Sequence, residues 1–397
     1  MKKSVKMLLA VCAFAFTVLL VSGTESKAAV NLGLKQTDAG SNSVDIEWNA
    51  YLGAGCYHVE FSTDGKTWTK MGNSSSPKDY IYNLGANTAY YARVVVYSGS
   101  HSSGETPVAV SETAVVATKP SEVQNLTQTG ATTNSVSMSW SPVAGANGYI
   151  IYAYVNYNWV QVATSTSTSA TISGLPASSK VGYCVAATRG VTGGTVLGDK
   201  SDSVYMRTVP AQVSRIAMSA YWQYLNDAQF EWTNMNNADG YQYEVTSNSG
   251  KKKYFSGTTT SSYVDVKPFP KGVFVKARVR AYITIGNQRV YGAWSPYTYT
   301  ASNKKVTAKR YSNGKKISLK WKKISGAAGY QVYISTKSNS GFKKVKSLSS
   351  KKTKYTITKY GKKKLKKGKI YYVQLRYQTK VGKKKVTSPI VGTVTVY

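Results

Sequence analysis

A tryptophan recurs at nearly constant spacing along the chain and constrains its architecture more than any other feature. It stands at Trp48, Trp140, Trp232 and Trp321, which are 92, 92 and 89 residues apart. In all four cases a tyrosine follows nine residues later, at Tyr57, Tyr149, Tyr241 and Tyr330. Self-similarity at a fixed period indicates a tandem array in which each period is one structural unit. The 397 residues therefore predict several small cores rather than one large one.

The residues before each tryptophan alternate between apolar and polar. Val44 and Ile46 alternate with Asp45 and Glu47 on the way to Trp48. The same alternation precedes the other repeated tryptophans and resumes after each repeated tyrosine. Period two is typical of a strand with one buried face, and no helical period competes with it after the N-terminal segment. We expect an all-β chain whose repeated Trp and Tyr lie in the cores.

These motifs resemble the fibronectin type III domain, a seven-stranded sandwich with a core Trp on its second strand and a Tyr on its third. The resemblance covers residues 30–397. Leu84 precedes Tyr90 by six residues, and Leu365 precedes Tyr371 by six, which matches the corner where that family's tyrosine hydroxyl bonds to nearby backbone. The resemblance implies four tandem seven-stranded immunoglobulin-like (fibronectin type III) β-sandwiches after a signal peptide.

The second and third units lack the corner tyrosine. Val181 stands six residues after Leu175, and Val275 stands six residues after Phe269. A valine side chain has no hydroxyl group that could bond to the backbone. We therefore expect these two corners to be held by packing alone.

The N-terminal segment has the pattern of a secretory signal. Lys2, Lys3 and Lys6 precede an apolar run at residues 7–21, and small and polar residues follow up to Ala28. The run is shorter than the roughly 20 residues that a membrane helix needs, and no later stretch approaches that length. We predict cleavage after Ala28, secretion of the mature chain, and no transmembrane anchor.

Short polar linkers divide the mature chain into four units. The predicted domains are residues 29–118, 119–208, 209–302 and 303–397, after a signal peptide at residues 1–28. Beyond the signal the chain has two cysteines, Cys56 and Cys184, at non-equivalent positions of different units. A disulfide framework is therefore not expected, although the sequence does not tell whether the two thiols stay free.

Groups suited to catalysis are scarce. The chain has two histidines, and the carboxylates of the mature chain are scattered without a calcium-loop pattern. Glycoside hydrolysis needs two carboxylates across a cleft, which a short sandwich does not provide. We predict a protein that is not an enzyme, with no catalytic residues, no metal site and no cofactor.

The net charge of +35 is concentrated in one unit. Residues 303–397 contain 26 Lys, 2 Arg and no Asp or Glu, whereas the other three units are close to neutral. Such a surface departs from the mixed-sign surface that solubility alone requires. Twelve of its lysines fall in expected turns and are the predicted polyanion-binding residues: Lys315, Lys316, Lys322, Lys323, Lys362, Lys363, Lys364, Lys366, Lys367, Lys383, Lys384 and Lys385.

The preference for lysine over arginine indicates salt-sensitive and unselective anion binding. An ammonium group lacks the planar guanidinium geometry that makes bidentate hydrogen bonds to phosphate groups or base edges. For a secreted chain the expected partner is an anionic cell-wall polymer or another extracellular polyanion, with no specific nucleic acid. The lysines could also serve solubility or protect strand edges. The last unit resembles the Lys-rich fibronectin type III modules that end secreted proteins of Gram-positive gut bacteria, a likeness carried by its composition and by Trp321 within a lysine run.

Some aromatic residues have no counterpart in the other units and are candidate ligand aromatics. They are Tyr152, Tyr154 and Tyr157 in the second unit, and Tyr221, Trp222 and Tyr224 in the third. Tyr152 and Tyr154 fall on the strand phase opposite Tyr149, so we expect them to face solvent. Packing between neighbouring units is the alternative. A further recurrent aromatic at Trp68, Trp159, Tyr254 and Phe342 is interpreted as a framework position of the fourth strand.

The sequence therefore predicts a secreted or cell-surface binding protein, a monomer, whose last domain holds anionic wall polymer while the others project outward. Attachment to the cell wall would be non-covalent, since no sorting motif precedes Tyr397. A glycan or a host surface protein is a further candidate partner. The alternatives are an inert extracellular spacer or matrix component and an accessory carbohydrate-binding protein.

Overall fold

The computed structural model describes residues 28–99, 107–222, 227–301, 306–388 and 393–397, with the side chains of residues 220–222 left out. The predicted signal segment and Tyr224 lie outside these residues, as do the side chains of Tyr221 and Trp222. In the described part every regular element is a β-strand, and no helix there could cross a membrane. The prediction of an all-β fold is confirmed.

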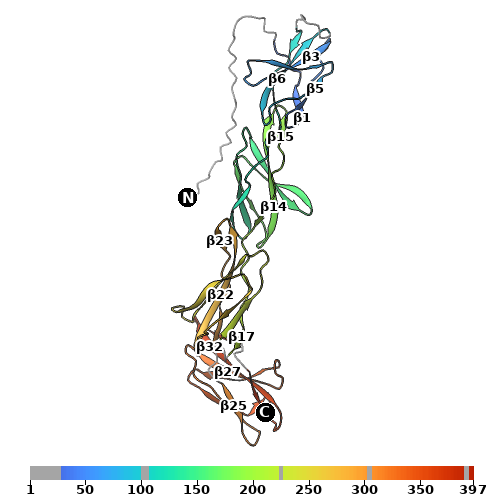
Figure 1. Ribbon diagram of the computed structural model, residues 1–397. Helices are drawn as coiled ribbons and strands as arrows, with labels where there is room; N and C mark the ends of the chain where they lie inside the picture. The colour runs from blue at the N-terminus through green and yellow to red at the C-terminus, as the bar shows by residue number, and fades with distance from the viewer. Residues whose placement is uncertain (1–27, 100–106, 223–226, 302–305, 389–392) are drawn as a thin grey trace, which may run out of the picture. The chain divides into compact units, whose positions relative to one another are not determined.

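Each sandwich consists of a three-stranded sheet packed on a larger sheet, as the first one illustrates (Figure 1). The small sheet has the order β1-β2-β5, and the larger has the order β4-β3-β6-β7 with β8 also paired to β6. The strands are β1 (Lys35–Ala39), β2 (Val44–Glu47), β3 (Cys56–Ser62), β4 (Thr69–Ser74), β5 (Lys78–Ile81), β6 (Ala89–Tyr97), β7 (Ala109–Val110) and β8 (Ala114–Ala117).

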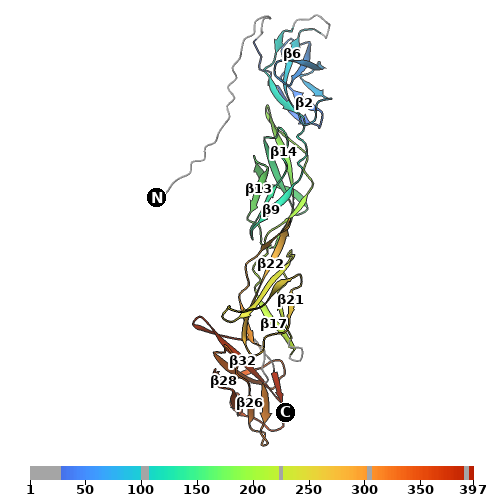
Figure 2. The same cartoon turned by 60° about the vertical axis from the view of Figure 1, so that its left-hand side comes forward.

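The second and third sandwiches repeat this topology, and Figure 2 shows them from a second direction. The second contains β9 (Thr127–Ala131), β10 (Ser135–Ser139), β11 (Gly148–Val155), β12 (Asn158–Ser165), β13 (Ser169–Ser173), β14 (Lys180–Val191), β15 (Gly194–Leu197) and β16 (Val204–Arg207). The third contains β17 (Ile216–Trp222), β18 (Asp227–Trp232), β19 (Gly240–Ser247), β20 (Lys253–Thr259), β21 (Tyr263–Val266), β22 (Phe274–Ile285), β23 (Gln288–Tyr291) and β24 (Thr298–Ala301).

The fourth sandwich has the same two sheets and a small hairpin between its fifth and sixth main strands. Its strands are β25 (Thr307–Arg310), β26 (Ile317–Lys320), β27 (Gly329–Ser335), β28 (Lys343–Ser349), β29 (Lys354–Ile357), β30 (Lys359–Tyr360), β31 (Lys363–Lys364), β32 (Tyr371–Val381), β33 (Lys384–Thr387) and β34 (Thr393–Val396). In all four tandem sandwiches the repeated Trp lies at or just after the end of the second strand and the repeated Tyr lies on the third, as the fibronectin type III resemblance implies.

The seventh strand of each sandwich is broken into two pieces that pair with the same neighbour. In the first sandwich β7 and β8 both pair with β6, and Ser111 lies at the break. The backbone N–H of Val94 donates to Ser111 Oγ at 2.9 Å, so the hydroxyl replaces the carbonyl that an unbroken strand would supply. Equivalent bonds run from Val185 to Ser201, from Val279 to Ser295 and from Tyr377 to Ser388.

The repeated tryptophan and tyrosine form the centre of each core, as predicted. Their rings meet edge to face at centroid distances of 5.3, 5.3, 5.4 and 5.4 Å along the chain. All eight side chains are buried. Each tyrosine hydroxyl accepts a backbone N–H six residues upstream, as Tyr330 does from Ile324 at 3.1 Å. The motif thus fixes both the core and the loop between the second and third strands.

The tyrosine corners are confirmed where the sequence has them. The Tyr90 hydroxyl accepts the N–H of Gly85 at 2.8 Å, and that of Tyr371 accepts the N–H of Lys366 at 3.1 Å. The second sandwich differs from the expectation of packing alone. There Thr208 Oγ1 accepts the N–H of Ser179 at 2.9 Å and donates to the Pro176 carbonyl at 2.8 Å, so the threonine directly after the last strand holds the corner through hydrogen bonds.

The chain divides into two compact units. One holds the first sandwich together with Arg189–Val196, the hairpin tip between β14 and β15. Within this unit Thr192 N–H donates to the Val115 carbonyl at 2.8 Å, and Val115 N–H donates to Thr192 Oγ1 at 2.7 Å. The other unit holds the rest of the second sandwich with the third and fourth.

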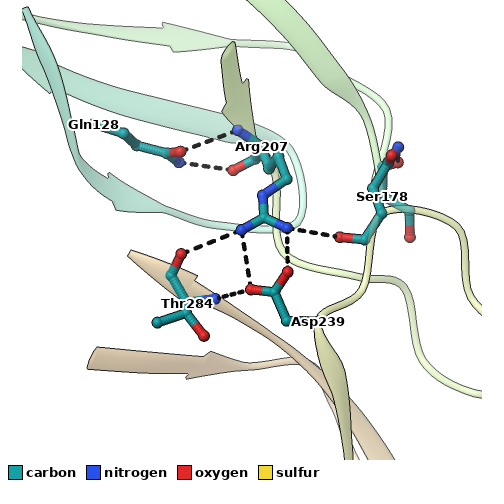
Figure 3. A network of polar contacts seen from close by, with 6 residues as sticks. Gln128, Ser178, Arg207, Asp239 and Thr284 are labelled. Carbon is teal, nitrogen blue, oxygen red and sulfur yellow. Dashed lines mark hydrogen bonds and ion pairs between the residues drawn. The ribbon is translucent and has the colours of Figure 1, made fainter. Parts of the chain in front are cut away.

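Arg207, at the end of β16, joins the second and third sandwiches inside the second unit (Figure 3). Its guanidinium forms an ion pair with Asp239, with Nη2 to Oδ2 at 2.9 Å, and Nη2 also reaches the Thr284 carbonyl at 3.3 Å. Gln128 fixes the Arg207 backbone through bonds of 2.7 and 3.0 Å. Burial raises the pKa of Asp239, but the hydrogen bonds from Arg207 and Thr284 outweigh it and hold that pKa below its usual value.

Apolar packing joins the third and fourth sandwiches. Phe274 of β22 lies in the core of the fourth sandwich, with its ring 6.4 Å from that of Tyr377. The backbone pairs at the same place, since Phe274 N–H donates to the Ser325 carbonyl at 3.2 Å. Asn248 Nδ2 also donates to Thr379 Oγ1 at 2.9 Å. The fourth sandwich is therefore packed on the third.

Candidate functional site

All twelve predicted lysines are exposed, and they lie in turns or at strand ends of the fourth sandwich. The antiparallel pairing divides them between two opposite ends. Arg310 pairs with Ile317 at one end, whereas Thr307 pairs with Lys320 at the other. Each turn between consecutive strands therefore falls at an end that the register determines.

Lysine cluster 1 lies at the end where β25 turns into β26 and where β29 connects to β32. It consists of Lys315, Lys316, Lys362, Lys363, Lys364, Lys366 and Lys367. The two turns are in contact. Arg310 Nη2 donates to the Lys366 carbonyl at 2.8 Å, and a Cβ on Gly314 would lie 2.7–2.9 Å from atoms of Lys367. The structure thus brings together lysines about 50 residues apart in the sequence.

Lysine cluster 2 lies at the end nearer Ser325 and the third sandwich. It consists of Lys322, Lys323, Lys383, Lys384 and Lys385, from the turn after β26 and from the hairpin between β32 and β33. The twelve predicted residues therefore form two surfaces and not a single one. The sequence shows which lysines lie in turns. The strand register is needed to assign each turn to one of the two ends of the sandwich.

Three further basic residues, on the paired strands β25 and β26, were not predicted. Lys309, Arg310 and Lys320 line an open pocket of about 620 Å³, together with Tyr311. Arg310 Nε is buried without an acceptor among the described residues. Its position on β25 gave no signal in the sequence, because the pocket forms only when β25 and β26 are paired.

Like charges crowd the fourth sandwich without compensation. The domain has no Asp or Glu side chain, so none of its lysines can form a salt bridge to a carboxylate side chain within it. The ion pairs of the described residues belong to the other sandwiches, for example Arg93 with Glu60 and Arg278 with Glu244. A surface of this kind creates a strong positive potential that attracts anions, and bound anions relieve its self-repulsion.

The predicted ligand aromatics differ in how far their side chains are exposed. Tyr154 is exposed as predicted, and Tyr157 is 90% exposed at the turn between β11 and β12. Tyr152 is half-buried, with Lys200 Nζ 4.6 Å from its ring centroid. Trp222 ends β17, and Tyr221 precedes it, but the exposure of these two side chains is not described.

The third sandwich carries a ladder of alternating cations and rings that sequence reasoning missed. Along β22, Lys276, Arg278 and Arg280 point to the same face of the sheet. Arg278 lies 4.3 Å from the Trp294 ring and 5.0 Å from that of Tyr297, and Arg280 lies 4.1 Å from Tyr291. These guanidinium groups are occupied by rings and by Glu244, so the basic residues of this face form a structural stack.

The two cysteine thiols lie in the interior of the sandwiches. Cys56 and Cys184 are buried and unpaired, in different sandwiches. Burial raises the pKa of the Cys184 thiol to about 11, although the nearby Lys200 lowers it, so the thiol stays protonated at neutral pH. Among the described residues no cluster of three or more His, Cys, Asp or Glu side chains could hold a metal ion.

Known proteins are similar to this chain over only part of its length. No family model matches the sequence. Exochitinase 1 of Streptomyces olivaceoviridis is 29% identical over 189 residues, which are 39% of this chain and 29% of that protein. The chain thus spans less than a third of the length of that relative.

Two solved structures are similar to the chain at low identity. The FN1–FN3 domains of chicken CNTN1 match 70% of this chain and 98% of that chain, with 15% identity and a TM-score of 0.26. A two-domain fibronectin type III segment of chicken tenascin matches 44% of this chain and 97% of that chain, with 16% identity and a TM-score of 0.24.

Proposed function

We propose that the chain is a non-catalytic extracellular binding protein whose fourth sandwich holds an anionic polymer at lysine clusters 1 and 2. One observation carries the proposal: a domain with 26 Lys and no carboxylate side chain keeps an ordinary sandwich core and exposes all twelve predicted lysines. The polymer we propose is an anionic component of a bacterial cell wall, because the N-terminal segment has the pattern of a secretory signal and the fourth sandwich resembles Lys-rich modules of secreted proteins of Gram-positive bacteria.

The chemistry of the clusters supports a polymer more than a small anion. Separate ammonium groups each attract one phosphate or carboxylate, so affinity rises with the number of charges engaged along a chain. Binding of this type releases counterions, and the logarithm of the affinity falls linearly with the logarithm of the salt concentration. Arg310, with its Nε lacking an acceptor, adds one group of fixed geometry beside cluster 1.

Sedimentation of the full chain with purified cell walls tests the proposal. Two variants each replace five lysines by glutamine: Lys315, Lys316, Lys364, Lys366 and Lys367 in cluster 1, or Lys322, Lys323, Lys383, Lys384 and Lys385 in cluster 2. We expect both variants to bind more weakly than the unmodified chain and to show a smaller salt slope, by about 0.7–0.9 for each lost contact. Walls stripped of their anionic polymer should bind little of any chain.

A matched control removes the same charge elsewhere. It replaces Lys66, Lys251, Lys252, Lys253 and Lys271, all exposed in the first and third sandwiches, by glutamine. This control should sediment like the unmodified chain. Equal loss in the control and in the cluster variants would show that net charge alone matters, and binding that ignores salt would contradict the proposal.

The similarity to an exochitinase favours a second candidate, an accessory carbohydrate-binding function. In that case the chain would bind insoluble chitin with little dependence on salt, since neutral sugars offer no counterions to release. Sedimentation with chitin beads at low and high salt distinguishes the two. If neither walls nor chitin bind the chain, the remaining candidate is a spacer.

A further inference from the structure

Strands of the second sandwich bring three aromatic side chains into one row across the outer face of its larger sheet. Tyr154 of β11 pairs with Trp159 of β12, and Gly182 of β14 pairs with Tyr205 of β16. A Cβ placed on Gly182 would lie 3.6–3.8 Å from Tyr205, Tyr154 and Trp159. The three side chains therefore meet above the bare backbone of Gly182.

The glycine is what allows the rings to approach. Gly182 is buried beneath them although it lies on the solvent side of the sheet. The rings of Tyr154 and Trp159 are 5.2 Å apart at their centroids. Because neighbouring strands lie about 4.8 Å apart, the row across β12, β11, β14 and β16 spans about 14 Å. We call Tyr154, Trp159 and Tyr205 the aromatic platform.

The platform is exposed and does not belong to the core. None of its three residues is in the buried cluster of the second sandwich. Tyr154 is 43% exposed and Tyr205 is 64% exposed. With roughly 200 Å² of surface on each tyrosine side chain, the two rings offer on the order of 200 Å². A stable protein interface needs about 800 Å² on each side, so the platform suits a slender ligand.

Two lysines border the platform. Lys180 Nζ lies 4.8 Å from the Tyr205 ring centroid, and Lys200 Nζ lies 4.6 Å from that of Tyr152, on the strand that carries Tyr154. Neither ammonium group forms a salt bridge with a carboxylate of the described residues. A ligand on the platform therefore meets flat apolar faces flanked by positive charge on two sides.

We propose that the platform binds an acidic polysaccharide, with the C–H faces of its sugar rings on the aromatic residues and its carboxylates near Lys180 and Lys200. Pyranose rings present a flat apolar face, as the aromatic rings do, and the length of the row accommodates more than one ring of a chain. The carboxylates supply the negatively charged partners that Lys180 and Lys200 lack among the salt bridges of the described residues. This site is in the second sandwich and does not depend on the lysine clusters of the fourth.

Calorimetric titration of the full chain with a soluble oligomer of galacturonic acid tests the site. At about 0.5 M salt the Debye length is only a few ångströms, so binding through the lysine clusters is screened while stacking persists. We expect Tyr205→Ala and Tyr154→Ala each to weaken binding by about tenfold. Tyr205→Phe, which keeps the ring, should bind within about twofold of the unmodified chain.

Matched controls separate stacking, charge and the other site. Tyr82→Ala removes a tyrosine that is 62% exposed in the first sandwich and should change nothing. At about 0.1 M salt, in a chain that carries both cluster variants, the methyl ester of the same oligomer, which keeps the rings and loses the charge, should bind more weakly than the acid, and Lys180→Ala with Lys200→Ala should abolish that difference. The cluster 1 variant should bind polyphosphate more weakly at low salt and keep high-salt binding of the oligomer.

The proposal fails if Tyr205→Ala and Tyr154→Ala bind the oligomer as the unmodified chain does while their unfolding midpoints are unchanged. It also fails if the methyl ester binds as tightly as the acid, which would indicate a neutral saccharide. Loss of polyphosphate binding in the cluster 1 variant with no oligomer binding by any chain would overturn the platform and leave the proposed function of the fourth sandwich intact.

Discussion

Four serine hydroxyls carry the same backbone hydrogen bond in the four sandwiches. Ser111, Ser201, Ser295 and Ser388 stand 90, 94 and 93 residues apart, at the break in each last strand. Each hydroxyl accepts a buried N–H that would otherwise lack a partner. The serine recurs almost as regularly as the tryptophan, but a small polar residue does not stand out among the many serines of the chain.

Replacing one of these serines should destabilise its sandwich. Ser201→Ala leaves the Val185 N–H buried without an acceptor, and we expect the free energy of unfolding to fall by about 1–3 kcal/mol. Ser169→Ala is the matched control, because Ser169 is exposed on β13. Denaturant titration of both variants measures the difference. Equal stability of the two would contradict the role assigned to the hydroxyl.

Residue identity predicted the cores better than the surfaces. Trp140 and Tyr149 were placed correctly because burial demands an apolar phase that the sequence displays. Trp159 was interpreted as a framework residue of the fourth strand, and it does lie on β12, yet its ring packs on the exposed Tyr154 and outside the core. Trp159 and Tyr205, 46 residues apart, both lie beside Gly182, and the successive pairing of β12, β11, β14 and β16 brings them there.

At the scale of elements, the turn between β25 and β26 determines the geometry of lysine cluster 1. Gly314 has a φ of +69°, which favours glycine, and its backbone passes close to Lys367. In the sequence, the lysines of this turn and those of the connection between β29 and β32 form two separate runs. The two turns come together because β26 pairs with both β25 and β29 in one sheet, and no local sequence pattern encodes that pairing.

Two glycine variants should separate backbone strain from this contact. Gly314→Ala introduces a side chain in the left-handed region and also pushes on Lys367, whereas Gly361→Ala, at a φ of +62°, meets open space. We expect Gly361→Ala to reduce stability by about 1 kcal/mol and Gly314→Ala by clearly more. Thermal unfolding of the two variants gives the comparison. A larger effect at Gly361 would refute the close approach of the turns.

The Arg207–Asp239 pair links two sandwiches and should respond to acid. The pKa of Asp239 is lowered in the folded chain, so its contribution is present above the carboxylate's unfolded pKa of about 3.9 and is lost as pH falls through the lower folded value. We expect Asp239→Asn to reduce stability near neutral pH by on the order of 1 kcal/mol, since the pair is partly exposed.

The pH dependence supplies the check on this junction. The difference in unfolding midpoint between the unmodified chain and Asp239→Asn should be constant from pH 5 to 7. It should then shrink at lower pH, because protonated Asp239 no longer differs in charge from asparagine. A difference that stays constant down to pH 2 would show that the ion pair adds nothing to the junction.

At the scale of the whole molecule, the division of charge is the feature that most needs a functional explanation. A fold alone does not select a function or a partner. Composition predicted which sandwich is polycationic because charge counts need no structure. It could not predict that the charge is divided between two ends, with Arg310 and Lys309 extending cluster 1.

Lysine footprinting tests the central claim most directly. The full chain is acetylated briefly with and without an anionic wall polymer, and mass spectrometry reports the protection of each lysine. We predict strong protection at Lys315, Lys316 and Lys366 in cluster 1, weaker protection in cluster 2 and none at Lys66. Protection spread evenly over all four sandwiches, or none in the fourth, would contradict the account.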